Sequence, residues 1–181
     1  MDAAAERSGI GPVAALVVAL AAGVVREAAR RSDGEWDEAS GASAQAGALR
    51  NHAVRLARED LDAHVAASGA LRAALERGEG RTAGDAPLAP ALARAADLPL
   101  EIAEVAVDLA ELAALTAEHG TSDLRADAAG AAQLAAGAVA AAEHLIAVNL
   151  ATGPGDERVA RVGQLRVAAD AASDRARNAS P

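Results

Sequence analysis

A chain of 181 residues with a net charge of −9 is long enough to bury one core and too acidic to be a general nucleic-acid binder. Hydrophobic residues make up 52% of the sequence, but most of them are alanines, and the chain has one Trp and no Phe, Tyr or Cys. The lack of Cys excludes a disulfide framework and a Cys-ligated zinc site. It fits a reducing compartment, so we expect a cytoplasmic protein.

The composition predicts an all-α protein. Ala, Leu, Arg and Glu, which are strong helix formers, dominate the sequence. No segment shows the alternation of aromatic or β-branched residues that is typical of a strand. We therefore expect a single domain over residues 1–181, folded as an antiparallel up-and-down bundle of about five main helices.

The first helix is predicted over residues 11–31, where Pro12 suits the first turn. The segment is apolar on all sides until Arg26, so we expect this helix to be fully buried at the centre of the bundle. The uncharged stretch 9–25 is slightly short for a bilayer, so we expect no membrane association. A membrane-associated helical protein is the alternative, and it would fail if the protein stays soluble without detergent.

The remaining helices are predicted, in chain order, over residues 37–77, 91–96, 98–118, 124–151 and 156–177. A turn at 32–34 precedes the first of these, and glycines and prolines mark 78–90 as a loop. We place Pro99 at the start of the helix over 98–118. Gly120 is expected to end that helix in the left-handed conformation.

Polar residues bracket the helix that follows. Asp127 lies near its predicted start and Asn149 near its end, 22 positions apart. That spacing is about six turns, so the two residues lie near one line along the helix.

Four stretches of sequence occur in a distinctive order: residues 9–15, Asp60 with His64, residues 96–100, and Asp127 with residues 145–150. They resemble the cyclodeaminase/cyclohydrolase family of tetrahydrofolate enzymes. Its members share a Gly-rich run before two Ala, an Asp before an aromatic position, a Thr-x-x-Pro, and an Asp that leads to Asn-Val-x-x-Asn-Leu. The likeness covers nearly the whole chain. His64 stands where the pattern has an aromatic residue, and four further positions depart from it: Ile10 replaces a Gly, Pro12 a Ser, Ala96 a Thr and Leu145 an Asn.

The resemblance implies a formiminotransferase-cyclodeaminase-like fold and a homodimeric enzyme of one-carbon metabolism. Such an enzyme hydrolyses 5,10-methenyltetrahydrofolate or cyclodeaminates 5-formimidoyltetrahydrofolate, with the folate as substrate and no further cofactor. Asp60 and Asp127 are the candidate catalytic carboxylates, because a carboxylate attracts the cationic carbon and accepts a proton from water. Gly9 and Gly11 at a helix start offer free N–H groups to the substrate. Asn149 is a candidate to bind the edge of the pterin.

Each candidate also has a purely structural interpretation. Asp127 suits the first turn of a helix, where its charge favours the dipole, and Asn149 suits the end of one. Asp60 lies in an acidic run with Glu59 and Asp62 that is typical of a solvated face. Gly9 to Gly11 alone fits a plain helix start. The four His residues are too scattered to predict a metal site.

The alternative function is a non-catalytic helical member of the same fold that binds another small molecule or a partner protein. The four departures from the family pattern motivate it. An enzyme requires a polar pocket that contains Asp127, Asn149 and a helix start. The non-catalytic alternative predicts that apolar side chains such as Ile10 and Leu145 fill that pocket.

Overall fold

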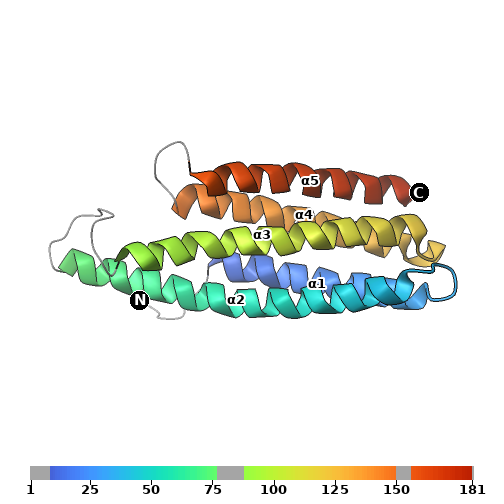
Figure 1. The fold of residues 1–181 in the computed structure, drawn as a ribbon, viewed down its shortest axis with the longest axis horizontal. Coiled ribbons are helices and arrows are strands. Elements are labelled where there is room, and N and C mark those ends of the chain that lie inside the picture. The colour runs from blue at the N-terminus through green and yellow to red at the C-terminus, as the bar shows by residue number, and fades with distance from the viewer. Residues whose placement is uncertain (1–8, 77–87, 150–155, 181) are drawn as a thin grey trace.

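Five α-helices make up most of the described part of the chain, which in this computed structural model comprises residues 9–76, 88–149 and 156–180 (Figure 1). The helices are Ile10–Arg31 (α1), Ala39–Glu76 (α2), Leu88–His119 (α3), Arg125–Asn149 (α4) and Glu157–Ala179 (α5), and a short 3₁₀ helix, Ser122–Leu124 (η2), precedes α4. These ranges contain no strand, so the predicted all-α class and the number of main helices are confirmed.

Consecutive helices run in opposite directions, as predicted, and give the bundle two distinct ends (Figure 1). The Ser32 end contains the α1–α2 connection and the turn from α3 through η2 into α4. The Gly11 end contains the first turns of α1 and α5 and the last turn of α4, while α2 and α3 extend past it. The first four helices contact one another as a four-helix unit, and α5 packs against α3 and α4.

The core is built mainly from alanine. Buried apolar residues from all five helices form one cluster, whose largest fully buried side chains include Leu56, Leu98, Ile102, Leu109 and Ile146. Because an Ala side chain adds little volume, helices approach closely along their Ala-rich faces, and these few larger side chains fill the remaining space. This explains how a chain with a single aromatic residue buries a continuous core.

Helix α1 lies at an edge of the bundle, so the prediction that it is central and fully buried is wrong. It contacts α2, α4 and α3, and its remaining side is open. Five large apolar side chains are 41–73% exposed there: Ile10, Val13, Leu16, Leu20 and Val24. The inner side of α1 is mostly alanine, and apolar character on all sides hid this asymmetry. Among the described helices, α1 alone is long and apolar enough to cross a membrane, and 44% of its most apolar stretch is buried.

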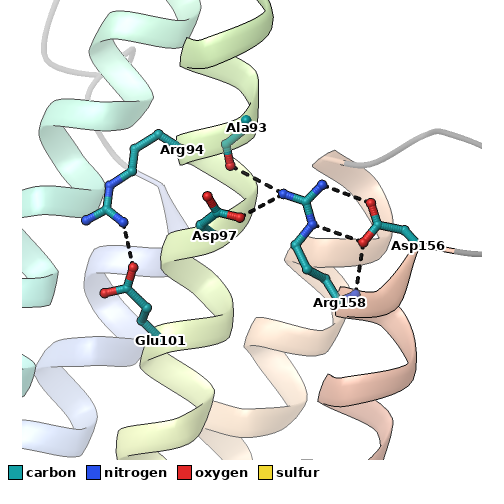
Figure 2. Close-up of polar contacts among 6 residues, drawn as sticks. All are labelled: Ala93, Arg94, Asp97, Glu101, Asp156 and Arg158. Atoms are coloured by element: carbon teal, nitrogen blue, oxygen red, sulfur yellow. Dashed lines mark hydrogen bonds and ion pairs between the residues drawn. The ribbon is translucent and has the colours of Figure 1, made fainter.

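Helix α3 runs without interruption from Leu88 to His119, so the predicted start of a new helix near Pro99 is wrong. Proline lacks the N–H that would donate to the preceding turn. Packing compensates, because Pro99 and the following Ile102 are almost completely buried. Arg158 of α5 also reaches this stretch, where its Nη1 donates to the carbonyl oxygen of Ala93 at 3.5 Å (Figure 2).

Two glycines at the Ser32 end have different roles. Gly34 has a φ of +92° in the predicted turn at 32–34, which is confirmed. Gly120 does not adopt the predicted left-handed conformation, and its N–H instead donates to the carbonyl oxygen of Thr116 at 2.9 Å. A Cβ atom at residue 120 would lie 2.5 Å from that oxygen and 2.9 Å from Ser32 Oγ. Close packing, not backbone handedness, requires glycine here.

Helix α5 is capped by Asp156, whose Oδ1 accepts a hydrogen bond from the backbone N–H of Arg158 at 2.9 Å. A stripe of buried residues at helical spacing faces the bundle: Val162, Leu165, Ala169, Ala172 and Ala176. Three arginines of α5 reach carboxylates of α3, in the pairs Arg158–Asp97 at 2.8 Å, Arg161–Glu104 at 3.4 Å and Arg175–Glu111 at 2.7 Å. Apolar packing and this ladder of ion pairs together fix α5 on α3.

Candidate active site

Asp60 is the only charged side chain that falls among the buried residues of the described chain, with 8% of its surface exposed. On α2 it follows Ala53, Leu56 and Ala57 at helical spacing, so it belongs to the inner face of the helix. Its neighbour Glu59 is exposed. The alternative of a solvated acidic face therefore does not apply to Asp60.

Gly11, in the first turn of α1, makes room for this carboxylate. A Cβ atom at residue 11 would lie 2.8 Å from Asp60 Cγ and closer still to Asp60 Oδ2, so any side chain there would displace the Asp60 carboxylate. The fold therefore brings together two of the residues that the sequence singled out, from the start of α1 and the middle of α2.

Neither the Asp60 carboxylate nor the start of α1 has a hydrogen-bond partner within the described residues. Gly9, the N-cap residue of α1, has no side chain to accept a bond, so the N–H groups of Ile10 and Gly11 are unpaired. Burial raises the pKa of the Asp60 carboxyl, and the charge of His64, one turn along α2, opposes this rise. A buried carboxyl without partners is costly, and such groups are concentrated at functional sites.

An ion-pair network ties α2 to α3 beside this carboxylate. The guanidinium of Arg94 on α3 contacts Glu59 of α2 at 2.7 Å and Glu101 of α3 at 2.5 Å. Glu59 is the residue next to Asp60 in the sequence. The network therefore holds the part of α2 that carries Asp60 against α3, although all three paired side chains are partly exposed and contribute modestly to stability.

A second network ties α5 to α3 at the same end, and Figure 2 shows its geometry. Arg158 contacts Asp97 of α3 and Asp156, its own helix cap, each at 2.8 Å. Hydrogen bonds from the Arg158 side chain and backbone lower the pKa of Asp156 to about 2. Asp97 lies within the predicted motif at residues 96–100, so this stretch of α3 is fixed from two sides.

Asp127 and Asn149 lie at opposite ends of α4. At 1.5 Å per residue their separation along the helix is about 33 Å, so a pocket within a single chain cannot hold both. Two residues on the same face of a helix can still be many turns apart. Asp127 is exposed in the first turn at the Ser32 end. Asn149 is the last residue of α4, at the Gly11 end, and its side chain lies outside what the structure describes.

Comparison with known proteins decides the family. The family model described as formiminotransferase-cyclodeaminase matches residues 1–167 of the chain. The chain belongs to the formiminotransferase-cyclodeaminase family. Its fold is similar to that of formiminotetrahydrofolate cyclodeaminase from Thermotoga maritima, with a TM-score of 0.83 and 20% sequence identity, over 96% of this chain and 88% of that chain. No curated protein sequence matches the chain.

The structure locates the departures from the cyclodeaminase pattern. Ile10 is 50% exposed on the open side of α1, so it does not fill a pocket within the chain. The non-catalytic alternative had expected it to fill one. Ala96 is buried in the core, where it offers no hydroxyl. Pro12 and Leu145 are half-buried. The chain thus has the buried Asp60 with a glycine beside it, whereas Pro12, Ala96 and Leu145 lack the polar side chains of the family pattern.

Sequence reasoning missed Arg94 and Arg158, which hold the helices around Asp60. No local pattern relates Arg158 to Asp97, because the two are 61 positions apart and meet only when α5 packs on α3. One signal was available, since Arg158 stands in the first turn after a helix cap. Within the ranges that the structure describes, no group of three or more His, Asp or Glu side chains could hold a metal ion.

Proposed function

We propose that this cyclodeaminase-family chain is an enzyme that converts 5-formiminotetrahydrofolate into 5,10-methenyltetrahydrofolate and ammonia, with Asp60 as its catalytic carboxylate. One observation carries the proposal: the Asp60 carboxyl is buried, has no hydrogen-bond partner among the described residues, and lies against the unpaired start of α1. Family membership, and the fold shared with a formiminotetrahydrofolate cyclodeaminase, support the choice of substrate.

The reaction moves one proton between two nitrogen atoms, which a single carboxylate can do. The N10 nitrogen of the folate attacks the protonated formimino carbon on N5, and Asp60 takes the N10 proton as the new C–N bond forms. The carboxyl then returns that proton to the amino group of the adduct, which leaves as ammonia. Substrate and product each carry one positive charge at the reacting carbon, so atoms and charges balance. A raised pKa suits a carboxyl that must both accept and release a proton.

The start of α1 supplies complementary hydrogen bonds. The N–H groups of Ile10 and Gly11 are free to donate to a carbonyl oxygen of the substrate, and the helix dipole favours negative charge there. An ionised Asp60 attracts the cationic carbon of the product. In this proposal Gly9 and Gly11 bind substrate through the backbone, and the amide of Asn149 binds the edge of the pterin.

The same site supports a second reaction, the hydrolysis of 5,10-methenyltetrahydrofolate to the 10-formyl compound. Asp60 would then take a proton from the attacking water instead of from N10. Cyclodeamination is the first choice because the similar structure bears that activity in its name.

The test follows the near-ultraviolet absorbance of 5,10-methenyltetrahydrofolate and the release of ammonia when the purified chain meets 5-formiminotetrahydrofolate. Asp60→Asn should slow turnover by about 10²–10⁴-fold. Asp62→Asn, two residues away and exposed, is the matched control and should stay active. Full activity of Asp60→Asn would contradict the role of Asp60. If the wild-type chain accelerates neither this reaction nor methenyl hydrolysis above buffer, the non-catalytic alternative gains support.

We also propose that the chain forms a homodimer through the open sides of α1 and α4. Both helices contact α3 on their inner side and each other, so their outer sides form one face. On α1 this face includes Leu16 and Leu20, and on α4 Leu134 is 51% exposed between Gly130 and Gly137, which leave open space. An apolar face of this kind is typical of an interface.

A two-fold axis across this face would pair the two copies antiparallel. Asp127 of a second copy would then approach the Gly11 end of the first, near Asp60. Two carboxylates from opposite ends of the bundle would in this way serve one site. This arrangement is how Asp127 can keep the catalytic role expected from the sequence.

Two measurements test the dimer. Leu20→Glu should convert the dimer to a monomer in sedimentation, because it places a charge in the apolar face. Asp60→Asn and Asp127→Asn should each be inactive alone, and chains refolded as a mixture should recover about a quarter of wild-type activity, because half the dimers have one intact site. Full activity of Asp127→Asn alone would remove Asp127 from the catalytic site.

A further inference from the structure

A groove of about 730 Å³ lies at the Ser32 end, between the beginning of α2 and the end of α3. Its lining includes Trp36, Asp37, Glu38, Gly41, Leu115 and His119. This volume is within the range of small-molecule sites. The groove is separate from the Asp60 site, which lies at the other end of the bundle, and from the open side of α1 and α4.

The groove contains Trp36, and the sequence has no other Trp and no Phe or Tyr. The Trp36 ring stacks on His119 with centroids 6.0 Å apart and an angle of 28° between the planes. Trp36 is 9% exposed, yet its indole N–H has no acceptor among the residues that the structure describes. A buried indole N–H usually finds a partner, so this donor is available to a ligand.

The charge of the groove is negative and uncompensated. Asp37 and Glu38 are both exposed, and neither has a cationic partner in the described ranges. Glu118, close by on α3, differs because Arg175 pairs with it at 3.0 Å. A plain structural role for the two carboxylates exists, since they precede α2 and favour its dipole. That role explains neither the groove nor the unpaired indole.

We propose that this groove binds a small aromatic cation that also carries a carbonyl oxygen. The Trp36 and His119 rings provide a stacking surface, and a cation over an indole is attracted by the ring. Asp37 and Glu38 supply the opposite charge, and the indole N–H donates to the carbonyl oxygen. The inference does not depend on the proposed enzyme activity.

Three compounds of nearly the same shape separate charge from stacking: 1-methylnicotinamide is a cation, nicotinamide is neutral, and nicotinate is an anion. Because the chain has one Trp, its amide-correlation NMR spectrum contains one indole N–H signal, which reports directly from the groove. We expect a saturable shift of this signal with 1-methylnicotinamide, at an affinity about five- to tenfold tighter than for nicotinamide. Nicotinate should bind most weakly. Equal affinities, or no saturable shift with the cation, would overturn the proposal.

Two pairs of variants locate the site. Asp37→Asn with Glu38→Gln should reduce the affinity for the cation to that for nicotinamide, while Asp33→Asn with Glu35→Gln, exposed in the same connection but outside the groove lining, should not. Gly41→Leu should block the groove, because open space surrounds its Cβ position and Leu favours a helix. Gly69→Leu is the control on the same helix, also in open space. Binding that survives Gly41→Leu would overturn the proposal.

Discussion

The two ends of the bundle share one packing device but use it differently. At each end a glycine allows the backbone to close over a buried polar side chain: Gly120 over Ser32, and Gly11 over Asp60. Ser32 Oγ donates to a carbonyl of α1 and accepts from the backbone N–H of residue 121, both at 2.9 Å. Asp60 forms no hydrogen bond to any described residue.

This difference is the one expected between a structural contact and the catalytic carboxyl proposed here. A buried polar group whose hydrogen bonds are complete stabilises one arrangement of the chain. A buried polar group without hydrogen-bond partners lowers stability, and such groups are found mainly at functional sites. The Ser32 contact therefore holds the α1–α2 and α3–η2 turns together, whereas the function proposed here requires the Asp60 carboxyl to be available to a ligand.

Replacing each of the two glycines by alanine should give the largest difference in stability between the two ends. Gly120→Ala should lower the free energy of unfolding by about 2–3 kcal/mol, because its methyl group would meet the Thr116 carbonyl, which belongs to the backbone of α3. Urea denaturation followed by circular dichroism measures this. Gly11→Ala should cost less, because its methyl meets the end of the Asp60 side chain, which can rotate. It should instead abolish turnover, and an equal loss of stability in both variants would contradict this distinction.

Ser32→Ala should have the next largest effect, a loss of about 1–2 kcal/mol. The substitution leaves the backbone N–H of Thr121 without its acceptor. Ser40→Ala, on the exposed face of α2, is the matched control and should change stability little. Because Ser32 lies far from the Asp60 site, turnover per folded molecule should stay at the wild-type value. A drop in turnover would show that the two ends are coupled.

Asp60→Asn should change stability in the opposite direction, raising it by about 0.5–2 kcal/mol at neutral pH. Burial raises the pKa of Asp60 above its unfolded value. The folded chain then holds the proton more tightly, so this contribution to stability is complete below the unfolded pKa and is lost as pH rises through the folded pKa. Denaturation of both proteins across that range measures the difference, which should grow with pH. A less stable variant at neutral pH would show that Asp60 has partners in solution.

The local sequence pattern was sufficient to predict the helical segments but not their positions in the bundle. The first helix was predicted over residues 11–31 and is Ile10–Arg31, because helix formation depends on nearby residues. Its position at the edge of the bundle could not be read from the same residues, since it depends on which helices flank it. The continuation of α3 through Pro99 was missed for the same reason, because burial by other helices overcomes a local helix breaker.

For the site, residue types were predictable and distances were not. Asp60 and Gly11 were identified through family likeness, yet nothing in the sequence places a carboxyl against the backbone of residue 11. Asp127 and Asn149 were expected in one pocket from the family resemblance, and the length of α4 separates them within one chain. The partners of Arg158 depend on the packing of α5 against α3, which no local motif encodes.

Asp156 offers the smallest effect and the sharpest comparison with Asp60, because the pKa of one carboxyl is lowered and that of the other is raised. Hydrogen bonds from Arg158 bring the pKa of Asp156 to about 2. Its contribution is present above the unfolded pKa, about 3.9 for Asp, and is lost as pH falls towards 2. Asp156→Asn still caps the helix but lacks this charge-dependent contribution, so it should be slightly less stable than wild type at neutral pH and approach wild-type stability as pH falls towards 2. The difference in free energy of unfolding between wild type and Asp156→Asn should thus vary with pH only below the ordinary Asp pKa. The corresponding difference for Asp60→Asn should vary only above it. If both differences vary over the same pH range, the opposite environments assigned to these two carboxyls at the Gly11 end are wrong.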